Sequence, residues 1–556
     1  MRFIFYFLFL VFILFIFLFA SSGFPLTWDE GEVLRRVNEL PDKWKSAAIS
    51  NEGHPQLPII LAATGKSLLP QKIFTQKFRL RFFSLFFVSI SLTFLFYRLW
   101  CEFNFSVAFF SIFSIFLIPR LFAVFQISAW DSCLIASWIC CLSFFPLFFR
   151  SIFGVIIFGF FLGLAFSSKF SGFAVPFPFL IWTIFFMFYD ESLRKIRFII
   201  FRRLFIVTII SIIVFFLFNP QFWFDPFNNV FRFFSLNIGR DINIPVMFLG
   251  QIYDLRRPLP FYNTIFWTII TAPLGLLFFF LIGCASILCN TISFDKIKCN
   301  ENSNLIFSGR RFGLLLFLNM SILLLIRMFP GLPVHDGVRL FAGSFVFLGI
   351  IAGIGASEFW QSKKFTVIFV TKNILPRFIT IIIFAITLFN MFWYAPQWLS
   401  FYNFTVGGLA GAVKIGMEAT YYWDGFDDEV IEWLNKNTNK DELILFSKFS
   451  PDTFSIYRED GVLKPQFYVM TDYYSDKNNS NSSGLTKADQ IRFYVTQNRA
   501  GLQTNVDLFF KRNAKPVFVK TIRKGGLGAW NLGNVPIIEI YDVKKLDKRF
   551  KRTLIK

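Results

Sequence analysis

Two short segments near the start of the chain contain residue types that can do acid–base chemistry. Asp29 and Glu30 directly follow the first long apolar stretch, and Glu52 and His54 come soon after them. Carboxylates and imidazoles can accept and donate protons in catalysis. Ionisable groups beside a bilayer are costly and are a functional-site hypothesis by default. These four residues are therefore the first candidates for a site, and His54 is one of only two histidines in the chain.

The composition is that of a membrane protein with many spans. Of the 556 residues, 55% are hydrophobic and 86 are phenylalanine, which is too apolar for a soluble chain of this length. Apolar stretches long enough to cross roughly 30 Å of hydrocarbon recur from Arg2 to Gln397. The net charge of +21 would suggest nucleic-acid binding in a soluble protein. In a membrane protein it indicates cytoplasmic Lys and Arg beside anionic membrane lipids, so no nucleic-acid partner is expected.

The apolar stretches predict about eleven spans. Their ranges are 3–20, 80–98, 104–118, 129–149, 152–167, 172–188, 204–218, 262–289, 312–329, 338–356 and 377–395. The first could instead be a signal peptide, but it is longer than the apolar core of about 7–15 residues that such peptides have. A retained first span is therefore favoured.

Basic residues are distributed unequally between the two sides of the membrane. If the N-terminus is cytoplasmic, the inner loops are rich in Lys and Arg, while the short outer loops carry single basic residues, namely Arg120, Lys169 and Arg339. Positive residues collect on the cytoplasmic side, so this orientation is favoured. An odd number of spans then places the C-terminal tail outside, as in a multi-pass protein of a bacterial inner membrane or its equivalent.

Two kinds of soluble structure are predicted around the spans. A transmembrane part, 1–397, has long outward loops at 21–79 and 219–261, and 398–556 is a C-terminal extracytoplasmic domain. Thr27 and Glu30 fit a capping box, so a helix is expected along the membrane surface after them. In the tail, 429–435 has the pattern of an amphipathic helix, and 443–446 and 536–541 have the pattern of strands. The expected fold class is an all-α polytopic membrane protein with a small C-terminal α/β domain.

This topology collects ionisable side chains on the outward side, at span ends or in loops. They are Asp29, Glu30, Glu52, His54, Arg120, Asp131, Lys169, His335, Asp336 and Arg339. In a pocket with both signs of charge, the cations can hold a phosphate while a carboxylate deprotonates an acceptor hydroxyl or amine. The combination suits a substrate whose leaving group is a lipid phosphate anchored in the bilayer.

The order of these motifs resembles the GT-C glycosyltransferases, in particular the protein O-mannosyltransferase and aminoarabinose-transferase branch (glycosyltransferase family 39-like). The resemblance rests on the Asp-Glu pair at 29–30, the Asn-Glu-x-His-Pro-x-Leu segment at 51–57 and the Asp at 131. It also rests on the Lys-containing segment 167–172, the His-Asp-Gly-x-Arg-x-Phe segment 335–341 and the junction 402–423. The similarity covers residues 1–430. Gln56 and Leu340 depart from the family pattern, where a proline and a histidine are usual, which implies either a different acceptor or a diverged site.

The resemblance implies an enzyme that moves a sugar from a polyprenyl-phosphate carrier to a protein, lipid or glycan acceptor on the outer face of the membrane. It would be an inverting hexosyl- or mannosyltransferase-like enzyme. Asp29 would be the base, and Glu52 and Asp131 would orient the acceptor or a cation. Lys169 and Arg339 would hold the carrier phosphate. Glu30, His54, Arg120, His335 and Asp336 would complete the substrate site. A divalent cation is the one cofactor that these carboxylates could hold.

Each of these residues also has a structural explanation. Glu30 could serve only in the capping box, and Gly53 and Pro55 could force a turn around His54. Asp131 could cap a helix. Lys169 could be a snorkelling cation at a helix end. Arg339 could merely pair with Asp336.

Two other functions also remain open. A transporter or flippase for a lipid-linked glycan would favour ionisable groups near mid-membrane and internal repeats, whereas here they gather at one face. A catalytically inactive scaffold of the same fold would explain the departures at Gln56 and Leu340. No phosphate-binding loop or dinucleotide fingerprint is present in the sequence, so nucleotide-driven transport is unsupported.

Overall fold

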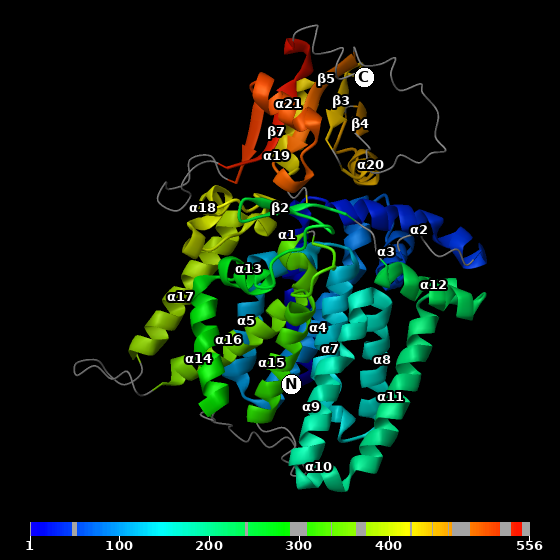
Figure 1. Cartoon of the computed structure of the whole chain (residues 1–556), viewed down its shortest axis with the longest axis vertical. Coiled ribbons are helices and arrows are strands. Elements are labelled where there is room, and N and C mark those ends of the chain that lie inside the picture. Colours follow the sequence, from blue (N-terminus) through cyan, green and yellow to red (C-terminus); the bar gives the residue numbers. More distant parts are fainter. Residues whose placement is uncertain are drawn as a thin grey trace.

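Long apolar helices form one bundle, and a small sheet domain lies beyond one end of it (Figure 1). The computed structural model describes residues 2–46, 53–239, 243–289, 309–334, 336–362, 374–422, 425–447, 449–464, 466–469, 490–522 and 535–546. Within these ranges, seven helices are long and apolar enough to cross a membrane, or nine spans if each of two bent helix pairs counts as one. The chain is therefore a multi-pass membrane protein.

The full-length spans are continuous helices. They are α1 (Arg2–Gly23), α4 (Gln76–Glu102), α7 (Trp130–Phe148), η1 with α9 (Phe170–Ala174 and Pro176–Tyr189), α11 (Arg197–Leu217), α16 (Gly343–Gln361) and α17 (Ile374–Tyr394). Among them, α7 and α16 are almost completely buried, whereas α1, α11 and α17 expose most of their residues. In a membrane protein, such exposed apolar faces are the surface that meets lipid.

Two expected spans are broken rather than straight. α5 (Phe105–Phe116) and α6 (Pro119–Gln126) are bent by 76°, and α13 (Asn263–Thr271) and α14 (Leu274–Cys289) are bent by 117°. Pro119 and Pro273 stand at the breaks, where a proline cannot donate the backbone hydrogen bond that would continue the helix. α8 (Ile152–Ser168) and α15 (Gly309–Ile326) are shorter apolar helices. Each of the eleven expected stretches is thus helical.

The helix predicted along the membrane surface is present as α2 (Trp28–Ser46). Its apolar residues Val33, Leu34, Val37 and Leu40 are buried, as their spacing predicts. α2 lies across the end of the bundle that faces the sheet domain, as do α12 (Pro226–Ile238) and the hairpin β1–β2 (Val246–Phe248 and Gln251–Tyr253) (Figure 1). α3 (Leu57–Leu68) and α18 (Gly408–Lys414) are also near this end, and α10 (Glu191–Lys195) is at the opposite one.

The C-terminal domain contains a five-stranded sheet of order β4-β3-β5-β7-β6. β3 (Leu443–Phe446) pairs in parallel with β4 (Gln466–Val469) and β5 (Ile491–Gln497), whereas β7 (Pro536–Asp542) is antiparallel to β5 and to β6 (Phe518–Thr521). The helices of this domain are α19 (Asp428–Asn437), α20 (Pro451–Glu459) and α21 (Asn505–Asn513). The predicted helix and both predicted strands are confirmed as α19, β3 and β7.

The C-terminal domain is joined to the bundle by direct packing of α20 on α2. The Thr453 hydroxyl donates to the carbonyl of Thr27 over 3.1 Å, and the Leu26 amide donates to the Tyr457 hydroxyl over 2.8 Å. The helices approach so closely at Gly31 that an added Cβ would lie 2.3 Å from the Thr453 hydroxyl oxygen. Glycine at this position therefore permits the contact that fixes the first turn of α2, where Asp29 stands.

Candidate active site

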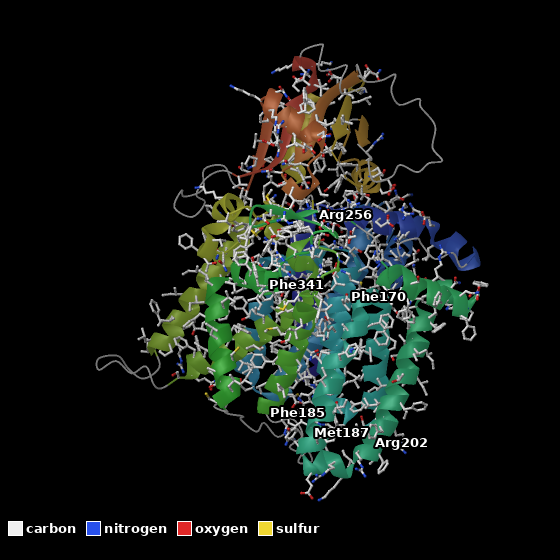
Figure 2. The ribbon with its side chains drawn as sticks, in the orientation of Figure 1. Phe170, Phe185, Met187, Arg202, Arg256 and Phe341 are labelled. Atoms are coloured by element: carbon white, nitrogen blue, oxygen red, sulfur yellow. The ribbon has the colours of Figure 1, made fainter. Side chains whose placement is uncertain are left out.

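Four acidic and three basic side chains from distant parts of the sequence form one connected set of ion pairs. They are Asp29, Asp131, Lys169, Asp336, Arg339, Glu418 and Arg499. Phe170 and Phe341, which neighbour Lys169 and Arg339 in sequence, lie in the half of the bundle nearer the C-terminal domain (Figure 2). Phe185, Met187 and Arg202 lie at the opposite end. We call the seven acidic and basic residues joined by these ion pairs the ion-pair cluster.

Arg339 is the centre of the ion-pair cluster. Its Nε donates to Asp131 over 2.8 Å, one terminal nitrogen donates to Asp336 over 2.7 Å, and the other pairs with Asp29. The guanidinium also lies 4.2 Å from the ring centre of Tyr422. All three of its nitrogens therefore have carboxylate partners. Although burial opposes the charge, these aspartates raise the pKa of Arg339 above its usual value.

A tight turn presents Arg339 to its partners. Asp336 and Gly337 have φ angles of 62° and 50°, in the left-handed region, at the start of the 3-10 helix η3 (Gly337–Phe341). Aspartate and glycine are among the residues that adopt this conformation most readily. An added Cβ on Gly337 would lie 3.3 Å from both Trp267 and Tyr421. The Asp-Gly pair in the sequence is therefore explained by this turn, which needs two residues that accept left-handed φ angles.

Asp131 and Lys169 extend the ion-pair cluster at the start of α7 and the end of α8. Asp131 is in the first turn of α7, and Lys169 follows the last residue of α8. The Lys169 Nζ donates to the Asp131 carboxylate over 2.6 Å, while the other carboxylate oxygen accepts from Arg339. Asp131 therefore holds both proposed phosphate-binding cations in place, rather than capping its own helix.

Asp29 has the electrostatic setting of a base that works near neutral pH. Its side chain is 14% exposed, on the first turn of α2. Burial raises the pKa of Asp29 to about 6, with Asp131 and Asp336 acting in the same direction and Arg339 acting against them. The carboxylate is mostly ionised at neutral pH, yet it is more basic than an ordinary aspartate. A general base is most effective when its pKa lies close to the working pH.

Arg499 and Glu418 complete the ion-pair cluster and were not predicted from the sequence. Arg499 comes directly after β5 of the C-terminal domain and donates to Asp336 over 3.0 Å and to Glu418 over 3.2 Å. It also donates to the carbonyl of Tyr421. Burial raises the pKa of Glu418, and Arg499 opposes this shift. Arg499 belongs to no motif, so its sequence context contains no signal of this position.

Glu30 is used within the fold. Its carboxylate accepts two hydrogen bonds from Arg81, at 2.6 and 2.8 Å, and also accepts from the amide and hydroxyl of Thr27. Arg81 also donates to the carbonyls of Phe24 and Pro25. The pair is 1% and 0% exposed. Glu30 therefore serves in the capping box with Thr27, as the sequence allowed, and it also pairs with the buried Arg81.

His54 and Arg120 lie outside the ion-pair cluster. The His54 ring stacks on Trp130 with 4.5 Å between ring centres, next to Asp131 in sequence. The Arg120 guanidinium donates to the carbonyl of Phe401 over 2.9 Å and lies 4.4 Å from the ring centre of Tyr402. Glu52 and His335, which were also predicted site residues, fall outside the described residues.

A small cavity of about 20 Å³, with room for little more than one water molecule, borders the ion-pair cluster. Its lining includes Arg120, Asp336, Arg339, Tyr421 and Tyr422. Two buried polar atoms at this cavity, Nη2 of Arg120 and the hydroxyl of Tyr422, make no hydrogen bond within the described part of the chain. Buried polar atoms ordinarily have partners, so these two donors are placed to bind a water molecule or a single ligand oxygen. Arg120 therefore belongs to the edge of the same site.

The described residues contain no group of three or more His, Cys, Asp or Glu side chains arranged to hold a metal ion. Asp29, Asp131 and Asp336 do converge, but they converge on the guanidinium of Arg339. A divalent cation would therefore compete with Arg339 for the same oxygens.

The fold of the bundle, together with the sheet domain at the end that carries this site, is similar to that of a solved structure with the GT-C fold. The aminoarabinose transferase ArnT from Cupriavidus metallidurans is similar with a TM-score of 0.53 in its apo state and 0.50 bound to undecaprenyl phosphate. Each comparison has 11% sequence identity and covers 96% of this chain and 97% of ArnT. The fold expected from the motifs is thereby confirmed.

A second similar structure is the archaeal oligosaccharyltransferase AglB from Archaeoglobus fulgidus, with 11% identity and a TM-score of 0.45 for its apo form. That comparison covers 88% of this chain and 69% of AglB. No protein-family model matches the sequence, and no curated protein matches it.

Proposed function

We propose that this protein is a membrane glycosyltransferase that takes a sugar from a polyprenyl-phosphate carrier and transfers it to a hydroxyl or amine of a protein, lipid or glycan. The observation that carries this proposal is the position of Asp29. Its carboxylate has a raised pKa and is in direct contact with Arg339. Arg339 and Lys169 are in turn both paired with Asp131. Base and phosphate-binding groups thus meet at one point.

The proposed reaction is a single in-line displacement. Asp29 accepts the proton of the acceptor, whose oxygen or nitrogen forms a bond to the anomeric carbon. The bond between that carbon and the carrier phosphate oxygen breaks, and the phosphate leaves with its electron pair. Attack opposite the leaving group inverts the anomeric centre. Lys169 and Arg339 stabilise the charge that develops on the departing phosphate.

Arg339 must change partners for this reaction to proceed. Its three nitrogens are all occupied by carboxylates in the present structure. A carrier phosphate can bind Arg339 only if it replaces one of these carboxylates. Asp29 and Asp336 are the two that can leave while Asp131 continues to bridge Arg339 and Lys169.

We further propose that the ion-pair cluster faces the extracytoplasmic side. Residues 1–397 would form the catalytic membrane part and 398–556 the exported domain. The basic residues around α10 and α11, at the opposite end of the bundle, support this orientation because such residues collect in the cytoplasm (Figure 1).

A transfer assay on the purified protein tests the proposal. A panel of polyprenyl-phosphate sugars is offered with hydroxyl and amine acceptors, and wild type is compared with Asp29→Asn. Transfer that the variant loses supports the proposal. Equal turnover of the two proteins removes Asp29 as the base. If no donor in the panel is consumed while the protein moves lipid-linked glycans across vesicle membranes, the protein is a flippase and the proposed function is wrong.

A further inference from the structure

The only basic residue that the described part of the C-terminal domain contributes to the ion-pair cluster is Arg499. Its side chain is 5% exposed, and it bridges Asp336 of the membrane part and Glu418 near the start of the C-terminal domain. Glu418 is itself held by the backbone amides of Met247 and Gly501, at 3.1 and 2.9 Å. Arg499 is thus held by Glu418 and by the carbonyl of Tyr421, and donates from its other terminal nitrogen to Asp336.

Asp336 is shared between two arginines. One carboxylate oxygen accepts from Arg339 over 2.7 Å, and the other accepts from Arg499 over 3.0 Å. A carboxylate that bridges two guanidinium groups can release one and keep the other without becoming an unpaired buried charge. Unpaired buried charges are strongly unfavourable. Arg499 therefore lowers the cost of separating Asp336 from Arg339.

We propose that Arg499 is a positioning residue that retains Asp336 when the carrier phosphate takes its place on Arg339. The inference rests on the proposed function and deepens it, because it explains how an arginine saturated with carboxylates becomes available to a phosphate. It also gives the C-terminal domain a defined part in donor binding. Arg499 touches neither the sugar nor the phosphate in this account, and acts only through Asp336.

The mechanism predicts a specific pattern in a double-mutant cycle. Without Arg499, Asp336 loses one of its two guanidinium partners, so it holds Arg339 more strongly and competes better with the phosphate. Arg499→Gln is therefore expected to weaken donor binding by about tenfold, the effect of losing one charge-assisted contact. Asp336→Asn removes the competing charge, so the double variant Asp336→Asn with Arg499→Gln should bind the donor nearly as well as Asp336→Asn alone.

The measurement uses the full chain in detergent micelles, with undecaprenyl phosphate as the binding probe and the Michaelis constant of the active polyprenyl-phosphate sugar as a second readout. Arg492→Gln is the matched control. Arg492 lies on β5 of the same domain and also faces two carboxylates, Asp542 at 3.2 Å and Glu442 at 3.9 Å, but it has no contact with the ion-pair cluster among the described residues. A loss of general domain stability would affect both arginine variants alike, whereas the proposal requires weakening only at Arg499.

The outcomes separate this inference from the proposed function. Weaker binding by Arg499→Gln that Asp336→Asn relieves supports it. Equal binding by the Arg499 and Arg492 variants overturns it while leaving the transferase intact, and so does a double variant as weak as Arg499→Gln. If wild type neither binds the probe nor transfers sugar, the proposed function itself fails.

If Arg499→Gln does not fold, Arg499→Lys is measured in its place. A single ammonium group cannot reach both carboxylates in the manner of a guanidinium. The lysine variant should therefore weaken donor binding by less than tenfold, and Asp336→Asn should again relieve the loss. Wild-type affinity in the lysine variant, with Asp336→Asn itself weakening binding, would overturn the inference.

Discussion

Asp29 and Arg339 are 310 positions apart in the chain and form a direct ion pair. Three independent features of the fold bring them together: the packing of α20 on α2, the left-handed turn at Asp336 and Gly337, and the bridging carboxylate of Asp131. The pair joins the proposed base to the proposed phosphate site. A change in either residue should therefore affect both the removal of the acceptor proton and the binding of the carrier phosphate.

Replacement of Asp29 tests the chemical step. Asp29→Asn keeps the size of the side chain but cannot accept the acceptor proton, so kcat should fall by about 100-fold or more. Asp29→Glu should retain part of the activity. Steady-state transfer kinetics on purified protein measure both, with Glu191→Gln as a control, because Glu191 is exposed and pairs only with Lys195 on α10 within the described structure. A kcat within about threefold of wild type would contradict the role of Asp29, because removal of a general base costs far more.

The pH dependence of transfer follows from the raised pKa of Asp29, which is about 6. The base must be ionised, so kcat/KM should increase with pH up to about 6 and then level off. Well below that value, each pH unit should reduce it about tenfold, because the ionised fraction of Asp29 falls in that proportion. An acid limb centred near 4, the ordinary value for an aspartate, would show that Asp29 does not limit the rate.

Lys169 and Arg339 should differ in their effects on donor and acceptor. Lys169→Met removes one proposed phosphate contact without touching Asp29 directly, so the KM of the donor should rise about tenfold with a smaller change in the KM of the acceptor. Arg339→Met removes the partner of Asp29 as well and should reduce kcat in addition. Initial rates at varied donor and acceptor concentrations distinguish the two. An unchanged donor KM in Lys169→Met would assign this lysine to structure alone.

The sequence could predict this site in part because several of its residues occur in ordered motifs. Asp29, Asp131, Lys169, Asp336 and Arg339 were all expected on one side, and they do lie in contact. Arg499 and Glu418 could not be predicted, since the contacts of Arg499 with Asp336 and of Glu418 with the Met247 amide depend on how the C-terminal domain packs on the bundle. Periodicity predicts that a tail helix is amphipathic, but not which surface will cover its apolar face.

The broken spans and the partner of Glu30 also could not be predicted, because both depend on tertiary packing. Pro119 and Pro273 mark possible breaks in the sequence, but the bends of 76° and 117° depend on tertiary packing. Glu30 was assigned both to a cap and to the site, and only the structure shows Arg81 against it. Arg81 lies in an apolar helix about fifty residues later, where no local pattern links it to Glu30.

A chelator should leave transfer active. Arg339 and Lys169 already supply positive charge among Asp29, Asp131 and Asp336, and a divalent ion would have to displace a guanidinium that makes three contacts. Such ions need several oxygen ligands at once. Activity measured after dialysis against EDTA should match that of untreated enzyme. Complete loss that Mg²⁺ or Mn²⁺ restores would show that the aspartates hold a metal during turnover and that Arg339 yields its place to it.

The pairing of Glu30 with Arg81 should contribute to stability and not to activity. Both side chains are almost completely buried, and removal of one partner leaves the other as an uncompensated charge. Arg81→Met should therefore reduce the free energy of unfolding by about 3–5 kcal/mol, and Glu30→Gln should also destabilise the protein. The double variant should be more stable than Arg81→Met, because it leaves no buried charge. Thermal unfolding followed by tryptophan fluorescence measures this order.

Activity per folded molecule is the second half of that test. Both carboxylate oxygens of Glu30 accept hydrogen bonds from Arg81 or Thr27. Folded Glu30→Gln protein should therefore transfer sugar with a donor KM close to that of wild type. A donor KM that rises about tenfold while the unfolding temperature stays unchanged would reverse the assignment, because such a change equals the loss of one direct substrate contact. Glu30 would then be a ligand of the substrate, and Arg81 the residue that holds it in position.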